Sequence, residues 1–283
     1  MYHCYKEFHE LIPPPNNHPL LAVGIGEETQ QPAPIHILEL GTGMAGLSAL
    51  ALGLRIAQVY DNQKDLLRSD SLTASRPPVA VTLTDGNEGG VLNNKVNQHL
   101  TKLHAPLEES EGGKDHPCCA VNVQCRTLLW TTDLVVDDGN DQSHSSDNNA
   151  IPLAEIILIS DCVRFQDFHA ALTCTVLRQL TVGGIAVFCQ PTRGDSLDNF
   201  CRLLDAVIYC SHDDDDDDSS PPLLSQRWWE PDILQEMHNH HSENNYYQES
   251  LHRPQLLVVV KLREMTVADQ QSLIAKHEEQ YCC

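Results

Sequence analysis

The feature that most constrains this chain is a strand, a glycine turn and a helix that follow one another directly near residue 40. An apolar run over 35–40 carries the acid Glu39 just before its end. The turn Gly-x-Gly-x-x-Gly comes next, with Gly41, Gly43 and Gly46, and small and apolar residues follow it. Such a turn lets the backbone approach a nucleotide-like ligand at the carboxyl edge of a parallel sheet. The same turn also occurs in strand-turn-helix units that bind nothing, and that alternative stays open.

A second strand end indicates which ligand the turn would hold. The apolar run over 79–84 ends in Asp85, a carboxylate placed to accept hydrogen bonds from ribose hydroxyls. No arginine follows that would favour a 2′-phosphate. In the dinucleotide pattern the first strand has no acid just before the glycines, whereas Glu39 stands there in this chain. The two strand ends therefore favour S-adenosylmethionine (SAM) over NAD as the cofactor.

The charge of the chain is strongly acidic and unevenly distributed. Acidic residues outnumber basic ones by 40 to 18, which gives a net charge of −22. More than half of this charge lies in three segments, 106–119, 137–149 and 213–218. The acid therefore marks solvated loop insertions, and we expect no nucleic-acid partner.

The composition and the first residues of the chain also indicate its cellular compartment. No stretch reaches the ~18 consecutive apolar residues of a membrane span, and the first residues lack the apolar centre of a secretory signal. Eleven cysteines without such a signal indicate reduced thiols rather than a disulfide framework. We therefore expect a monomer without a membrane span, located in the cytoplasm, with the nucleus as a second compartment.

Strand and helix signals alternate along the chain, which is typical of a Rossmann-like, doubly wound α/β sheet. The alternation continues across every insertion, so we expect one domain over 35–263, between an N-terminal extension (1–34) and a C-terminal tail (264–283). Strands are predicted at 35–40, 79–84, 123–129, 154–160, 184–190, 205–210 and 255–262. Helices are predicted at 44–56, 88–104, 167–180, 195–206 and 230–240, and loop insertions at 61–78, 106–119, 137–150 and 211–225.

Two further strand ends carry residues at the place where ligands bind in such sheets. The run 156–160 ends in Asp161, the carboxylate that we expect nearest to the chemistry. An acid at this place also serves to cap the following helix, which is the alternative interpretation. The segment 128–133 brings Trp130 to another strand end, where it is equally a candidate core aromatic.

With these residues in place, the chain resembles the class I (seven-strand) SAM-dependent protein-lysine methyltransferases, and within them the calmodulin-lysine type. The resemblance covers most of 35–263 apart from the insertions. It implies a seven-strand sheet with an antiparallel C-terminal strand, and methyl transfer from SAM to a lysine of a protein substrate, with calmodulin suspected. It is carried by Glu-Leu-Gly-Thr-Gly-Met (39–44), Leu-Thr-Asp-Gly-Asn-Glu (83–88), Leu-Leu-Trp (128–130), Ser-Asp-Cys-Val (160–163) and the segments 193–201 and 251–261.

The resemblance also implies roles for the matching residues. Asp85 would hold the ribose, and Trp130 would pack against the adenine ring. Asp161 would face the methionine end of SAM or the incoming lysine, which makes it both a cofactor contact and the catalytic candidate. The full set of implied cofactor-binding residues is Glu39, Gly41 and Gly43 at the methionine end, Asp85 at the ribose, Gly86, Asn87 and Trp130 at the adenine, and Asp161.

The chain departs from the family pattern at two places. Members usually carry an aromatic Trp-Pro-Ser-like segment before the glycine turn, whereas residues 1–34 contain no tryptophan. At the Asp-x-x-Tyr/Phe signature, Arg164 stands where an aromatic is expected and Phe165 follows it. Two alternatives therefore stay open: a methyltransferase that acts on a lysine of another protein, and a catalytically silent SAM-fold binding module.

The remaining polar motifs predict no metal site and no lipid anchor. His238, His240 and His241 do not place three ligands on one helical face, and no cysteine stands at zinc-site spacing. The aspartate run 213–218 lacks the glycine and the bidentate glutamate of a calcium loop. The ending Tyr281-Cys-Cys is not a C-a-a-X box and follows acidic residues.

Overall fold

The computed structural model describes the segments that form one sheet and the helices around it. Some sequence predictions concern residues outside these segments: residues 1–33 of the N-terminal extension, the three acidic segments, most of the helix at 230–240, the three histidines and the last two cysteines. The described residues are 34–43, 46–66, 78–103, 121–133, 151–191, 194–208, 222–230, 234–235, 239 and 254–281.

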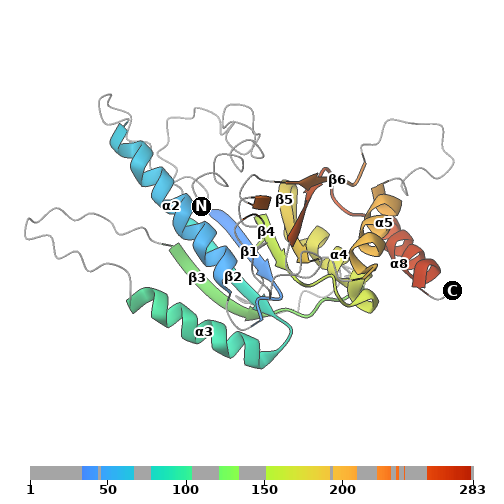
Figure 1. Cartoon of the computed structure of the whole chain (residues 1–283), viewed down its shortest axis with the longest axis horizontal. Coiled ribbons are helices and arrows are strands. Elements are labelled where there is room, and N and C mark those ends of the chain that lie inside the picture. The colour runs from blue at the N-terminus through green and yellow to red at the C-terminus, as the bar shows by residue number, and fades with distance from the viewer. Residues whose placement is uncertain are drawn as a thin grey trace, which may run out of the picture.

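Seven strands form one sheet in the order β3-β2-β1-β4-β5-β7-β6 (Figure 1). The first five of these strands pair in parallel, and β7 runs antiparallel to both of its neighbours, β5 and β6. This arrangement confirms the predicted seven-strand α/β sheet, including the antiparallel C-terminal strand. The strands are β1 (Ile35–Leu40), β2 (Val79–Asp85), β3 (Val121–Thr127), β4 (Ala154–Ser160), β5 (Leu180–Pro191), β6 (Leu224–Trp229) and β7 (Pro254–Lys261).

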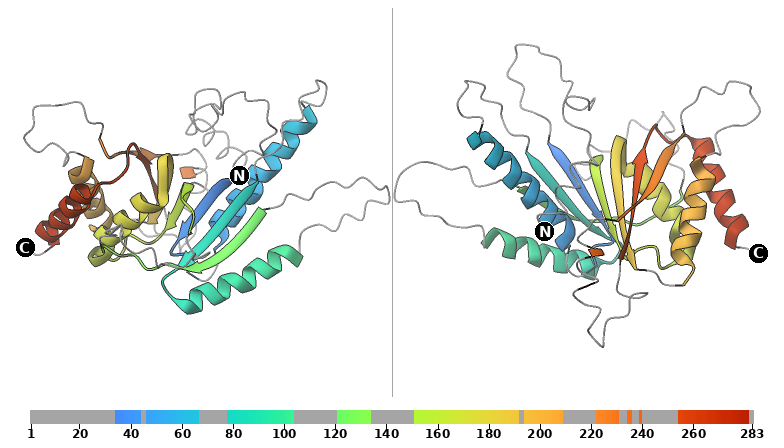
Figure 2. Two further views of the ribbon diagram at one scale, coloured as in Figure 1. Left: turned by 180° about the vertical axis from the view of Figure 1, so that it is seen from behind. Right: turned by 45° about the horizontal axis from the view of Figure 1, so that its top comes forward.

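Helices lie on both faces of the sheet (Figure 2). Two of them, α2 and α3, contact the β1, β2 and β3 half, whereas α4, α5 and α8 gather at the other half. Within the described segments, no helix combines the length and the apolar character that crossing a lipid bilayer requires. The helices are α2 (Leu47–Leu66), α3 (Glu88–Leu103), the 3-10 helix η1 (Gln166–Phe168), α4 (His169–Gln179), α5 (Ser196–Ile208) and α8 (Val267–Tyr281).

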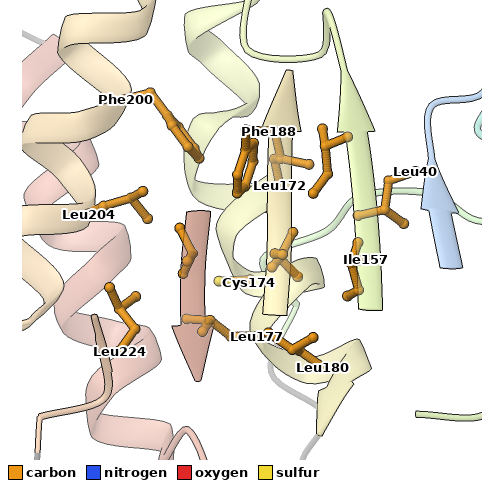
Figure 3. Close-up of a cluster of buried hydrophobic side chains, with 14 of the residues drawn as sticks. Leu40, Ile157, Leu172, Cys174, Leu177, Leu180, Phe188, Phe200, Leu204 and Leu224 are labelled. Atoms are coloured by element: carbon orange, nitrogen blue, oxygen red, sulfur yellow. The ribbon is translucent and has the colours of Figure 1, made fainter. Parts of the chain in front are cut away.

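Two buried clusters, one on each face, hold the helices to the sheet. In β1, Ile37 belongs to the cluster beneath α2 and Leu38 to the cluster with α4 and α5, because successive side chains of a strand point to opposite faces. The second cluster includes Phe188 of β5 and Phe200 of α5, whose ring centroids lie 5.0 Å apart (Figure 3). Both clusters include side chains of β4, and five of its seven residues are apolar.

The predicted strand at 205–210 is wrong, because this segment is the last part of α5 as far as Ile208. The short apolar run at 206–208 is typical of a strand, but the buried side chains recur at helical spacing. The outer strand of the sheet is β6, which the sequence analysis placed partly in the loop at 211–225. The buried residues of α5 are Ser196, Leu197, Phe200, Leu203, Leu204 and Val207.

The segment that the sequence analysis described as a C-terminal tail contains α8, which packs against α4 and α5. A capping box starts this helix: the Thr266 N–H donates to Asp269 Oδ2 at 2.8 Å, and the Asp269 N–H donates to Thr266 Oγ1 at 3.1 Å. Arg263 adds a bidentate pair to the same carboxylate, at 2.6 and 2.8 Å. These contacts fix the start of α8, so the layer of helices on this face includes the C-terminal segment.

Candidate functional site

The predicted site residues meet at one edge of the sheet. They follow β1, β2, β3 and β4, which are adjacent and parallel, so their carboxyl ends lie side by side. The turn after β1 and the loop after β3 both bind to the end of β2: the Thr42 N–H donates to the Thr84 carbonyl at 3.0 Å, and the Leu128 N–H donates to the Asp85 carbonyl at 3.2 Å. The structure therefore brings together the residues that the sequence analysis selected from four separate segments.

Asp85 is the centre of this arrangement. Its Oδ2 accepts the Gly43 N–H at 2.8 Å, and its Oδ1 accepts the Asn87 N–H at 2.7 Å. The side chain is half-buried, and α3 starts so close that a β-carbon on Gly90 would lie 2.9 Å from the Asp85 Cγ. Each carboxylate oxygen has a second lone pair. Asp85 therefore organises the glycine turn and can still accept hydrogen bonds from a ligand.

The glycine turn has one crowded position and one open position. Gly41 has a φ of +65°, and a β-carbon there would lie 2.6 Å from Cys162 Sγ and 3.2 Å from Trp130 Cζ2. Gly43 has a φ of +56°, and no described atom lies within 4 Å of a β-carbon placed on it. The turn thus packs tightly against Cys162 and Trp130 at Gly41, whereas no described atom crowds it at Gly43.

Trp130 reaches the turn from the loop after β3. It is half-buried and packs against the larger core cluster as well as against Gly41. Its role as a core aromatic, which the sequence analysis left open, is thus compatible with a place beside the site. Contact with an adenine ring stays a prediction.

Glu39 lies deeper than the other site residues. It is 4% exposed, and its Oε2 accepts the Ala49 N–H at 2.8 Å. Ala49 is in the first turn of α2, where backbone N–H groups lack partners within the helix, so Glu39 caps this helix. Burial raises the pKa of the carboxyl above its ordinary value, against the opposing effect of the hydrogen bonds from Ala49 and Ser48. The predicted contact with the methionine end of SAM stays a prediction beside this observed structural role.

Replacing Glu39 by glutamine should change the pH dependence of stability while keeping the cap, because the amide oxygen still accepts the Ala49 N–H. A carboxyl whose pKa is raised in the fold favours the folded state at pH values below its unfolded pKa, and this contribution is lost as pH rises through the folded pKa. We therefore expect the wild-type free energy of unfolding to fall relative to Glu39→Gln as pH rises above about 4.5. Urea titrations of both proteins from pH 4 to pH 8 (about one unit apart) measure this difference, and parallel curves would contradict it.

Asp161 stands at the end of β4 in a strained backbone conformation. Its φ is +54°, the one positive value among the described non-glycine residues. Its N–H donates to the Cys189 carbonyl at 3.0 Å, and the residue is exposed at the sheet edge. A positive φ costs roughly 1–2 kcal/mol for most residues with a β-carbon and less for aspartate, and such conformations gather at functional sites. The role of Asp161 at the site stays a prediction beside this observed backbone conformation.

Cys162, which the sequence analysis did not select, lies directly beneath the turn. Its Sγ is 3.5 Å from the Leu40 carbonyl and 3.3 Å from the Ser160 carbonyl. Burial first, and then the nearby carboxylates of Asp161, Asp85 and Glu39, raise its pKa to about 12. The thiol is therefore neutral near pH 7, and it is a packing partner of Gly41 rather than a nucleophile.

A buried polar chain behind the turn was also missed. Thr84 Oγ1 donates to the Glu39 carbonyl at 2.8 Å, Thr42 Oγ1 donates to the Thr84 carbonyl at 3.1 Å, and Asn94 Nδ2 of α3 donates to Thr42 Oγ1. Asn94 is fully buried, and its Oδ1 has no partner among the described residues. The threonines inside the apolar run of β2 were a visible signal, whereas an asparagine in the middle of a helix gave none.

Aromatic rings stand close to the position that Arg164 occupies. The Arg164 guanidinium lies over the Phe165 ring, 5.6 Å from its centroid, and the rings of Phe165 and Phe168 meet edge to face at 6.5 Å. Both phenylalanines are exposed by about half. An exposed aromatic ring, that of Phe165, thus follows Arg164 directly. Over the described segments, no group of three or more histidine, cysteine, aspartate or glutamate side chains could hold a metal ion.

Comparison with known proteins gives similarity in structure alone. No protein-family model matches the chain, and no curated protein sequence is significantly similar to it. A methyltransferase from Pyrococcus furiosus is 11% identical over 83% of this chain and 78% of its own, with a TM-score of 0.39. An rRNA methylase from Streptococcus thermophilus is 13% identical over 81% of this chain and 87% of its own, with a TM-score of 0.37. Human methyltransferase 10 domain containing protein is 8% identical over 92% of this chain and 81% of its own, also with a TM-score of 0.37. These values are too low to indicate a reaction or a substrate, so the function is inferred from the residues of the site.

Proposed function

We propose that this chain transfers a methyl group from SAM to a lysine side chain of a protein, with calmodulin as the first substrate to test. The observation that carries the proposal is the junction of Gly43 with Asp85 at the carboxyl edge of the sheet. It joins a glycine turn with open space in front of it to a carboxylate with free lone pairs. A ribose with two free hydroxyls, next to an amino acid moiety, fits these features.

The residues present fit SAM. Asp85 would accept hydrogen bonds from the ribose hydroxyls, with Gly86 and Asn87 near the adenine. Trp130 offers an apolar surface beside the turn. Once bound there, SAM supplies an electrophilic methyl group on a sulfonium.

The protein's own task is then to position the lysine and to exclude water, because an in-line displacement depends mainly on these two factors. A free lysine has a pKa of ~10.4 and must lose a proton before it can attack. A nearby sulfonium charge and partial burial both lower this pKa, so no dedicated base is required. We assign Asp161 the role of holding the lysine ammonium group before deprotonation.

We expect Asp161→Asn to raise the KM for the protein substrate about tenfold, the size of one charge-assisted hydrogen bond. The affinity for SAM should change much less, because the cofactor is held mainly through Asp85. Steady-state rates and calorimetric SAM titrations separate the two effects, and Asp198→Asn removes an exposed charge from α5 as a matched control. A variant that binds SAM and methylates at the full wild-type rate would rule out this role for Asp161.

The proposal is tested by incubating the full chain with radiolabelled SAM and unmethylated calmodulin, and by locating the label by mass spectrometry. Label on a lysine, absent with Asp85→Ala, is the expected result. Label on another protein of a cell lysate, but not on calmodulin, would support methyl transfer to a protein and show that calmodulin is not the substrate. No label on any protein would refute lysine transfer and leave a silent SAM-fold module, the alternative that Arg164 favours.

The net charge of the chain allows a specific test of calmodulin as the substrate. Calmodulin is acidic, so a chain with a net charge of −22 is repelled by it at long range. Because the screening length is about 8 Å at physiological salt, acidic loops far from the docking surface matter little there. Transfer to calmodulin should therefore become faster as salt rises from low to physiological concentration, whereas transfer to a basic protein should become slower. A cytoplasmic location remains part of the proposal.

A further inference from the structure

The loop after β4 is held in place at Val163, whose backbone N–H and carbonyl both form hydrogen bonds. The Val163 N–H donates to Gln190 Oε1 of β5 at 3.2 Å. The Val163 carbonyl accepts a hydrogen bond at 2.8 Å from His169 Nε2 of α4, and another from Ser196 Oγ of α5. Gln190 also donates from Nε2 to the Ile159 carbonyl at 3.2 Å. Three different elements thus fix the peptide that lies two residues beyond Asp161.

His169 is itself fixed from the far end of the chain. It is fully buried, and its Nδ1 lies 2.7 Å from the Tyr281 hydroxyl in the last turn of α8. The carbonyl partner can only accept, so Nε2 carries the ring proton and Nδ1 accepts from the tyrosine. Burial raises the pKa of Tyr281 to about 12, so the phenol keeps the proton that it donates. The ring of His169 also packs against Phe200, with centroids 5.2 Å apart.

We propose that His169, held by Tyr281, is a positioning residue for Asp161, and this inference rests on the function proposed above. The strained φ of Asp161 persists only where the surrounding structure fixes the backbone. On one side the Asp161 N–H is tied to Cys189, and on the other side Val163 is held by His169, Ser196 and Gln190. Release of the Val163 carbonyl would let the strain relax and move the carboxylate away from the site.

His169, which joins Tyr281 to the Val163 carbonyl, is a titratable group. Burial lowers the pKa of His169 below its ordinary value, an effect that the Val163 carbonyl and Asp167 oppose and that His277 reinforces. Besides Tyr281 and His277 of α8, the charged groups facing this cluster are Asp167 of η1 and Arg202 of α5, which acts on Tyr281. Protonation at Nδ1 reverses this hydrogen bond: the ring then donates to the Tyr281 oxygen, and the phenolic proton loses its acceptor. The neutral pairing is thus intact at pH values above the pKa of His169 and is replaced as pH falls through it.

The test uses Tyr281→Phe and His169→Gln in the full chain, with two readouts. The first is hydrogen exchange of the Asp161 and Val163 amides, which needs no reaction. The second is the pH dependence of kcat/KM, taken as the ratio of wild type to variant so that the ionisation of the substrate lysine cancels. Gln270→Ala is the matched control, because it removes a contact of α8 with the Thr132 carbonyl at the opposite end of the helix from Tyr281.

Tyr281→Phe should speed exchange of the Val163 amide about tenfold at neutral pH, the size of one lost hydrogen bond. It should also move the loss of activity at acid pH towards higher pH, because Nδ1 becomes free to take a proton. His169→Gln keeps one N–H donor and cannot titrate, so its exchange should be independent of pH after correction for intrinsic rates. Gln270→Ala should leave unchanged the acid midpoint, the pH at which half of kcat/KM is lost on the acid side.

Two outcomes would overturn the inference: unchanged exchange in Tyr281→Phe, or the same acid midpoint in Tyr281→Phe and wild type. A wild-type chain that transfers no methyl group refutes the proposed function instead. In that case the exchange of the Asp161 and Val163 amides still decides whether His169 holds the loop.

Discussion

Asp85→Ala is expected to weaken SAM binding on the order of 100-fold. Hydrogen bonds to a charged carboxylate contribute about 1.5–3 kcal/mol each, and about 1.4 kcal/mol is a factor of ten in affinity, so two ribose hydroxyls account for this loss. The variant also frees the N–H groups of Gly43 and Asn87, which the carboxylate now fixes at 2.8 and 2.7 Å. Isothermal titration of SAM and of its demethylated product measures the effect.

Two matched variants sharpen this prediction. Asp85→Asn keeps one acceptor oxygen without the charge, so its affinity should fall between wild type and Asp85→Ala. Glu278→Ala removes the same charge from an exposed position on α8 and should bind SAM as wild type does. Equal affinity of wild type and Asp85→Ala would show that the cofactor, if bound, does not use this carboxylate.

Gly41→Ala is expected to lower the free energy of unfolding by about 3 kcal/mol. A residue with a β-carbon at a positive φ costs roughly 1–2 kcal/mol, and an overpacked contact adds about 1–3 kcal/mol. Both apply here, because φ is +65° and the new carbon would lie 2.6 Å from Cys162 Sγ. Chemical denaturation with equal m-values in wild type and variant provides the measurement.

Gly43→Ala is the natural control, since it shares the positive φ but meets no described atom within 4 Å. Its cost should be about 1 kcal/mol, from backbone strain alone. Placing Gly41→Ala in a Cys162→Ala background removes the sulfur and should make the glycine substitution less costly there. If Gly41→Ala and Gly43→Ala proved equally destabilising, the close approach to Cys162 would have no energetic weight.

The predictions from sequence succeed where a residue's type and its local pattern agree. The turn at Gly41 and Gly43 needs positive φ values, and both glycines have them. The run of β4 is apolar because its side chains enter both buried clusters, so the strand could be predicted without a structure, with Asp161 directly after it. The position of Asp85 at the end of β2 was predicted by the same reasoning, from an acid after an apolar run.

The rest depends on contacts between segments that are far apart in the sequence. The end of α5 at 206–208 was misassigned, because three apolar residues in a row do not reveal a helical period. The burial of Glu39 against Ala49 could not be inferred, since an acid before a glycine turn serves equally as a cap or as a ligand contact. His169 and Tyr281 are 112 positions apart, and their contact exists only because α8 packs against α4.

The most direct test of the account is a crystal structure of the full chain with S-adenosylhomocysteine, the demethylated form of SAM. We expect the ribose hydroxyls against Asp85, the adenine beside Gly86, Asn87 and Trp130, and the amino acid end over the turn at Gly43. Asp161 should then face the sulfur. A ligand bound elsewhere, or no ligand at a saturating concentration, would contradict the assignment of this sheet edge as a SAM site.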